Sequence, residues 1–141
     1  MKFIDFITNG KVRKSQPDVE QAKSLVKIAQ KNFQAIQTID LTDETSSILF
    51  SQSYESLRQV VEALCLIEGF KVYSHEAYTY YLKEHDRLYE SEVFDRLRRL
   101  RNGINYYGKP VSITVTQNAF HDIQNLITIF TELIDEKIKQ I

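Results

Sequence analysis

The chain contains few of the residues that break helices or build covalent frameworks. It has only two prolines and four glycines in 141 residues, which leaves little material for tight turns and favours long helices over many short strands. A single cysteine, Cys65, excludes an internal disulfide framework and argues against a cysteine-based zinc site. Cys65 lies between Leu64 and Leu66, so we expect a packed thiol rather than a nucleophile.

Long apolar runs are also absent. No stretch approaches the roughly 20 consecutive apolar residues that a membrane-spanning helix needs, so we expect no membrane partner. The first residues include Asp5 and lack the long apolar core of a signal peptide. The sequence therefore predicts a cytoplasmic, reducing location.

Charge of one sign is not in excess either. The formal net charge is −1, and the contents of 43% hydrophobic and 26% charged residues are ordinary for a globular protein. The length of 141 residues predicts one domain over residues 1–141. Any anion binding must therefore come from a local concentration of positive charge. Lys23, Lys27 and Lys31 recur at helical spacing, and we interpret this basic edge as a solvated surface.

The main pattern that the sequence does contain is apolar residues spaced three and four apart. This spacing predicts an all-α fold, an antiparallel helical bundle of four to five main helices plus a short N-terminal helix or arm. The expected elements are an arm over residues 1–14 and helices over residues 15–38, 42–69, 74–88, 92–108 and 116–141. We expect Ser15 to cap the first long helix and Thr116 the last one. The alternating residues 111–115 predict an extended connector between the last two helices.

One arginine of the 92–108 helix does not fit its pattern. At about 100° per residue, Arg101 lies one turn after Leu97, inside the apolar arc that also holds Leu100 and Ile104. A guanidinium cannot lose its proton to escape burial, so Arg101 needs a partner or an anionic ligand. Asn105 follows one turn later on the same edge. The sequence therefore predicts an anion-binding site at this end of the helix.

Two readings of the neighbouring charges stay open at this point. Glu55, Arg58 and Glu62 stand at helical spacing, and this pattern is typical of a surface string of ion pairs. Alternatively, Glu62 supplies a carboxylate to Arg101 across the helix interface, with Arg58 in support.

Other kinds of site have little support in the sequence. The three histidines, His75, His85 and His121, have no second ligand at metal-binding spacing, so we expect no metal and no cofactor. We interpret His75 and His85 as cap or surface residues. The chain has no glycine-rich phosphate loop and no nucleophile elbow.

The run from Arg101 to Gly108 at the end of a long helix resembles the HEPN superfamily, small all-helical prokaryotic domains often encoded beside a minimal nucleotidyltransferase in toxin–antitoxin pairs. The resemblance covers roughly residues 45–110 and includes the segments 53–58, 62–64, 69–71 and 74–76. It implies a homodimer in which the motifs of two subunits meet across a cleft. It also implies a possible nucleotidyltransferase partner.

Many members of that family are metal-independent RNases with an Arg, often a polar neighbour directly after it, and a His that follows the Arg after four to six intervening residues. Here Arg101 matches the Arg and Asn102 the polar neighbour, but Tyr106 stands where the His is expected. In some members a Tyr beyond the His accepts an adenylyl group, and Gly108 occupies that position here. Phenol groups titrate near pH 10 and are weaker acid–base catalysts at neutral pH than imidazole. The resemblance therefore favours a fold and an anion site over RNA cleavage.

The leading interpretation is a HEPN-like homodimer that binds a nucleotide or RNA phosphate. The expected ligand-binding residues are Arg101, Asn102, Asn105, Tyr106 and Arg98. The first alternative is a metal-independent ribonuclease in which Arg101 and Tyr106 act and Arg101 stabilises the transition-state phosphate. The second is a structural assembly module in which Arg101 is satisfied by Glu62 or by a helix-end carbonyl.

Overall fold

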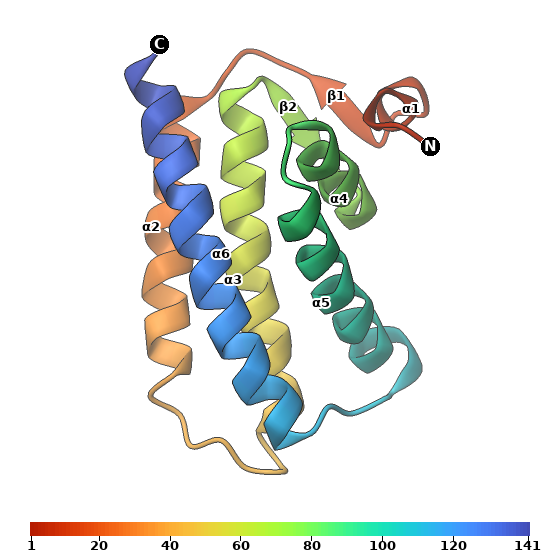
Figure 1. Ribbon diagram of the computed structural model, residues 1–141, viewed down its shortest axis with the longest axis vertical. Helices are drawn as coiled ribbons and strands as arrows, with labels where there is room; N and C mark the ends of the chain where they lie inside the picture. The colour runs from red at the N-terminus through yellow and green to blue at the C-terminus, as the bar shows by residue number, and fades with distance from the viewer.

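The structure is a computed structural model that describes residues 1–141. Helix α3 (Ser46–Ile67) lies at its centre. Its side chains are buried on most sides, as its broad apolar arc requires. Helices α2 (Val19–Ile36) and α6 (Ile113–Lys139) pack against α3 on one side, and α4 (His75–Glu84) and α5 (Leu88–Tyr107) lie on the other (Figure 1). The predicted all-α bundle of five main helices is thus confirmed.

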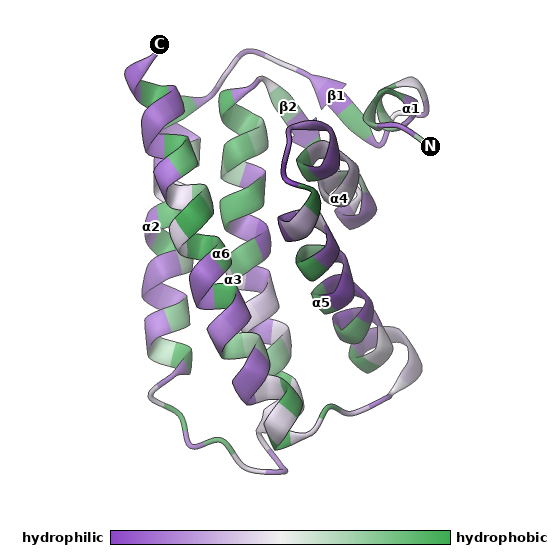
Figure 2. Cartoon of the chain, viewed as in Figure 1, coloured by the Kyte–Doolittle hydropathy of each residue, from purple (hydrophilic) through white to green (hydrophobic).

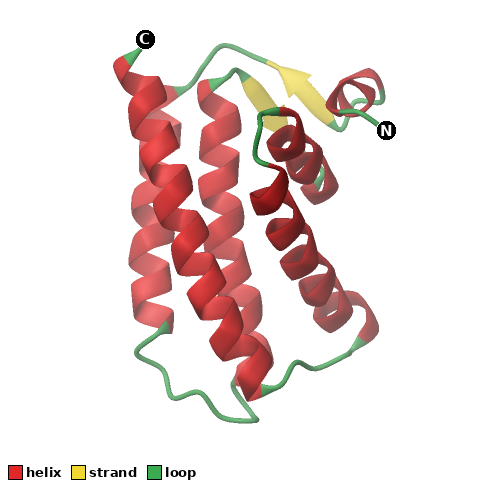
Figure 3. Ribbon diagram, viewed as in Figure 1, coloured by secondary structure: helices red, strands yellow, loops and turns green.

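The N-terminal segment is tied to the bundle by a short ribbon of two strands (Figure 3). Strand β1 (Val12–Lys14) pairs antiparallel with β2 (Phe70–Val72), and Val12 lies opposite Val72. Helix α1 (Phe3–Thr8) precedes the ribbon and buries Phe3 and Phe6, so the expected N-terminal arm is a short helix followed by a strand.

The first long helix begins at Val19, later than predicted, and Asp18 rather than Ser15 caps it. The Asp18 carboxylate accepts a hydrogen bond from the backbone of Gln21 at 3.0 Å. The backbone N–H of Ser15 instead donates to the carbonyl of Gly69 at 2.8 Å. Ser15 therefore holds the chain against the end of α3, three residues before the position that caps α2.

The last helix begins earlier than predicted, and the extended connector over residues 111–115 was a wrong prediction. The Ser112 hydroxyl accepts from the backbone of Val115 at 3.1 Å, which caps α6 and starts it at Ile113. Thr116 is buried inside α6, where its hydroxyl donates to the carbonyl of Ser46 at 3.1 Å. The cap by Ser112 and the buried hydrogen bond of Thr116 stabilise the helical conformation here more than the alternating pattern of residues 111–115 favours an extended one.

Helix α5 ends at Gly108, which adopts a left-handed conformation with a φ of +62°. The buried residues of the helices are mostly apolar, and apolar and polar residues alternate along each helix (Figure 2). Cys65 is completely buried in this core, as expected for a packing residue. None of the helices combines the length and the apolar character that crossing a membrane would require.

Candidate functional site

Arg101 lies on the side of α5 that faces α3, and its guanidinium has no carboxylate partner. Its guanidinium carbon lies 5.1 Å from the centre of the Tyr54 ring, and its Nη2 donates a hydrogen bond to Nδ1 of His75. The Nε group is buried and has no hydrogen-bond partner. An arginine that is half-buried, held only by neutral groups and not fully satisfied keeps its whole charge for a ligand.

A groove of about 560 Å³ opens beside this guanidinium, between the first half of α3 and the last turns of α5. Neutral polar groups of α3 lie along it, and one of them, the Ser51 hydroxyl, is buried without a partner. The residues that line the groove are Glu44, Ser47, Ile48, Ser51, Gln52, Tyr54, Glu55, Arg101, Ile104 and Asn105. Two unpartnered buried polar groups, Nε of Arg101 and the Ser51 hydroxyl, thus belong to residues of the same groove.

The two acidic residues of α3, Glu55 and Glu62, form ion pairs with Arg58 of the same helix and not with Arg101. Arg58 donates to Glu55 and to Glu62, in each case at 2.6 Å, and to the hydroxyl of Tyr78 at 3.3 Å. Burial alone would lower the pKa of Arg58, but these hydrogen bonds outweigh it and raise that pKa. The hypothesis that Glu62 supplies a carboxylate to Arg101 was therefore wrong, because Glu62 already serves Arg58 on its own helix.

His75 begins α4, and its side chain lies between Tyr54 and Arg101. The Tyr54 hydroxyl is 3.0 Å from Nδ1 of His75. Burial, together with the positive charge of Arg101, lowers the pKa of His75 to about 4, and burial raises the pKa of Tyr54 to about 12. Both groups are therefore neutral near pH 7.

The other predicted site residues are only partly gathered around Arg101. Asn105 lines the groove, and the Tyr106 ring lies 5.8 Å from the guanidinium carbon while the side chain remains 69% exposed. Asn102 is not among the lining residues. Arg98 points elsewhere, because it donates to the carboxylate of Asp95 at 2.8 and 3.0 Å.

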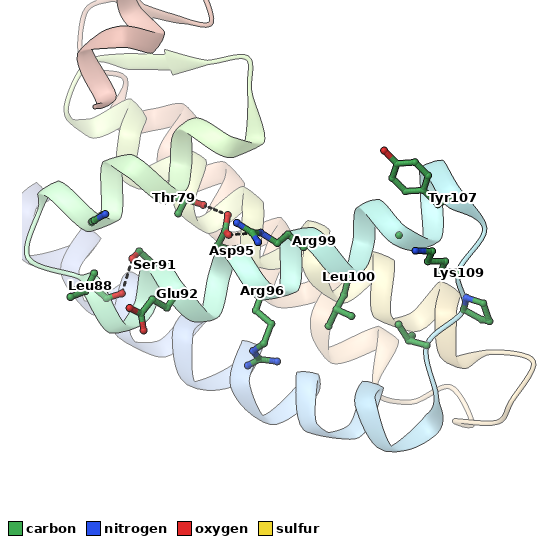
Figure 4. Close-up of a pocket in the computed structure, with 14 residues that line it drawn as sticks. Thr79, Leu88, Ser91, Glu92, Asp95, Arg96, Arg99, Leu100, Tyr107 and Lys109 are labelled. Atoms are coloured by element: carbon green, nitrogen blue, oxygen red, sulfur yellow. Dashed lines mark hydrogen bonds and ion pairs between the residues drawn. The ribbon is translucent and has the colours of Figure 1, made fainter. Parts of the chain in front are cut away.

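A larger cavity, of about 1000 Å³, lies on the opposite side of α5 (Figure 4). Its arginines are paired: Arg99 with Asp95 at 2.8 Å, and Arg96 with Asp122 of α6 at 2.9 Å. Asp95 also accepts from Thr79 of α4 at 3.1 Å. This cavity is the larger of the two, but the unpaired arginine is in the smaller one.

Sequence reasoning missed two residues of the site. Tyr54 has the apolar spacing of a core residue on its helix and is buried, but the same ring also lies under the Arg101 guanidinium. His75 was interpreted as a cap or surface residue, and its contact with Arg101 joins two helices over 26 positions of sequence. His85, in contrast, does lie at the C-terminal cap of α4, where its ring stacks on Tyr81.

No groups of His, Cys, Asp and Glu come together in a way that could hold a metal ion. No model of a known protein family matches the chain, and a search among curated proteins finds no match either. The chemistry of the Arg101 groove is therefore inferred from its own geometry. One arginine without a carboxylate partner lies beside neutral hydrogen-bonding groups, and the two acids that also line the groove, Glu44 and Glu55, make no ion pair with it.

Proposed function

We propose that the protein binds the phosphate of a nucleotide or of RNA in the Arg101 groove. The observation that carries this proposal is the half-buried guanidinium of Arg101, which meets no acid and borders an open groove. A guanidinium offers two parallel N–H groups that match phosphate oxygens. Ser51, Gln52 and Asn105 can add neutral hydrogen bonds, and the exposed Tyr106 ring offers a surface on which a base can stack.

The test is the affinity for a short fluorescein-labelled single-stranded RNA, measured by fluorescence anisotropy, with a nucleoside triphosphate as unlabelled competitor. Arg101→Ala should weaken binding by about tenfold or more, because hydrogen bonds to a charged partner contribute about 1.5–3 kcal/mol each. Arg99→Ala is the matched control, since this arginine is on the same helix but its side chain is 75% exposed and outside the groove.

Circular dichroism must show that both variants keep their helices. Arg99→Ala should change the affinity by no more than about twofold, as is usual for a surface ion pair. Equal affinity of wild type and Arg101→Ala would remove the Arg101 groove from consideration as the phosphate site.

The ribonuclease alternative uses the same groove. Arg101 would stabilise the phosphate in the transition state, and the nearest candidate for proton transfer in the motif is Tyr106. Cleavage of RNA that persists in the presence of EDTA and disappears in Arg101→Ala would favour this alternative over binding alone.

The homodimer and the nucleotidyltransferase partner are proposed on the resemblance to the HEPN superfamily. Arg101 would then lie in a cleft shared by two subunits. Analytical ultracentrifugation tests the dimer, and a gene for a minimal nucleotidyltransferase next to this one would support the partner. A monomer at all concentrations would contradict the shared cleft but leave phosphate binding by one subunit intact.

A further inference from the structure

The partner that holds Arg101 in place is an imidazole, where a carboxylate is the more usual choice. His75 comes from α4, Tyr54 from α3 and Arg101 from α5, so three helices meet at Nδ1 of His75. An acid at this point would fix the guanidinium equally well but would cancel its charge. The neutral imidazole of His75 fixes the guanidinium of Arg101 and leaves its positive charge uncancelled.

The direction of the hydrogen bond determines which nitrogen of His75 carries the proton. A guanidinium has only N–H donors and no acceptor, so Nδ1 must accept with its lone pair. Nδ1 has a single lone pair, so the Tyr54 hydroxyl, 3.0 Å from the same nitrogen, can only point its proton toward this lone pair and share it with Arg101. The ring proton is therefore on Nε2, and the ring is neutral.

Charged groups around the ring act mostly in the same direction. Arg101 and Arg98 of α5 and Arg58 of α3 all oppose a positive charge on His75, and Glu55 of α3, which favours it, is already bound by Arg58. Within α4, His75 is the first residue, where the positive end of the helix dipole also opposes protonation. The remaining neighbours, Tyr54 and Tyr78, are buried phenols whose pKa values are raised by burial.

We propose that His75 is the positioning residue of the site: as a neutral imidazole protonated on Nε2, it holds the Arg101 guanidinium and leaves the full positive charge to the ligand. This inference rests on the proposed phosphate site and adds the reason why that site attracts anions at all. The Tyr54 ring supports the guanidinium from below, and its hydroxyl fixes the orientation of the imidazole.

The sharpest test compares His75→Asn with His75→Asp. An Asn or Asp oxygen can take the place of Nδ1 as the acceptor for Arg101, and the two side chains have nearly the same shape. Only Asp brings a negative charge. We expect His75→Asn to bind the labelled single-stranded RNA within about threefold of wild type and His75→Asp to bind it at least about tenfold more weakly, because a carboxylate in contact with the guanidinium cancels its charge.

His75→Leu removes the acceptor without adding charge and should weaken binding while the helices remain, as checked by circular dichroism. Similar affinities for His75→Asn and His75→Asp would overturn the inference, since charge at this position would then have no effect. Equal binding by His75→Leu and wild type would overturn it too, since no acceptor would be needed.

A second measurement does not depend on any ligand. Nitrogen-15 NMR of the imidazole at pH 7 in the wild-type protein should show a proton on Nε2 and none on Nδ1, and the His75 titration should move to higher pH in Arg101→Ala. A proton on Nδ1 would overturn the positioning role whatever the binding data. If wild type binds no phosphate probe but the Nε2 proton is found, the proposed function fails while the geometry of the contact stands.

Discussion

At the scale of single residues, the site depends on one group whose protonation is changed by its surroundings. His75 titrates near pH 4 in the folded protein, because burial and the neighbouring Arg101 oppose its charged form. An unfolded chain would titrate at the ordinary value of about 6.5. The two states thus bind different numbers of protons between these pH values.

The free energy of unfolding should therefore fall as the pH is lowered from about 6.5 to about 4. In this range the unfolded chain takes up a proton on His75 and the folded chain does not. Below it both states are protonated and the loss stops. The loss attributable to His75 should be about 1 kcal/mol once solvent screening of this partly exposed ring is allowed for.

Urea unfolding of wild type and His75→Asn at pH 7 and pH 4 measures this contribution. The difference between the two proteins isolates His75 from the other two histidines, because only His75 is replaced. A difference that does not change with pH would show that His75 titrates alike in both states.

At this scale the sequence predicts Arg101 but not its partner. The place of Arg101 in the apolar arc of its helix is a matter of local spacing, and the structure does place it against Tyr54. His75 belongs to another helix, and nothing in the residues around it indicates what it contacts. Glu62 failed as a predicted partner for a different reason: Arg58, one turn away on its own helix, binds it, which is the ion-pair alternative that the sequence spacing also allowed.

At the scale of the elements, the most constrained joint is the turn after α3. Gly69 has a φ of +84°, and a Cβ atom at this position would lie 2.7 Å from the carbonyl oxygen of Ser15. Backbone atoms cannot move aside as a flexible side chain can. The turn therefore needs glycine for both conformation and space.

Gly69→Ala should lower the free energy of unfolding by about 2 kcal/mol or more, because the strain of a positive φ adds to the clash. Gly103→Ala is the matched control: Gly103 is inside α5, where the added Cβ would have ordinary contact with Lys109 at 3.8 Å. It should stabilise the protein by up to about 1 kcal/mol. Urea unfolding compares the three proteins, and equal stability of Gly69→Ala and wild type would contradict the clash.

The helices themselves could be predicted from the sequence, but their ends could not. Apolar spacing indicates the helices because each must bury one face, whatever it packs against. Helix ends depend on which polar group finds a backbone N–H, and several candidates compete within a few residues. Asp18 takes the place expected of Ser15, and Ser112 that of Thr116, because the other member of each pair is used for a tertiary hydrogen bond.

At the scale of the whole molecule, charge is nearly balanced, so the proposed binding of nucleic acid requires a local concentration of positive charge. The formal net charge is −1, and the arginines of the large outer cavity are each paired with an acid. A ligand held through Arg101 alone displaces few counterions. Extended contact with the lysine edge of α2 would displace several.

The affinity for single-stranded RNA should therefore depend only weakly on salt. A plot of the logarithm of the association constant against the logarithm of the salt concentration should have a slope of about −0.7 to −1.5, as one or two phosphate contacts predict. Anisotropy titrations at several salt concentrations give this slope. A slope steeper than about −3 would mean that a wide basic surface, such as the edge formed by Lys23, Lys27 and Lys31, contributes to binding.

The two walls of the groove differ in how firmly the bundle holds them. One wall belongs to α3, which is enclosed by the other helices and can shift only if the core comes apart. The other wall is the exposed tail of α5, which stops at a left-handed glycine before the connector to α6. Any widening of the groove for a ligand must therefore come from movement of the last turns of α5. The backbone amide hydrogens of Asn105 and Tyr106 should then exchange with solvent much faster than those of the residues around Tyr54.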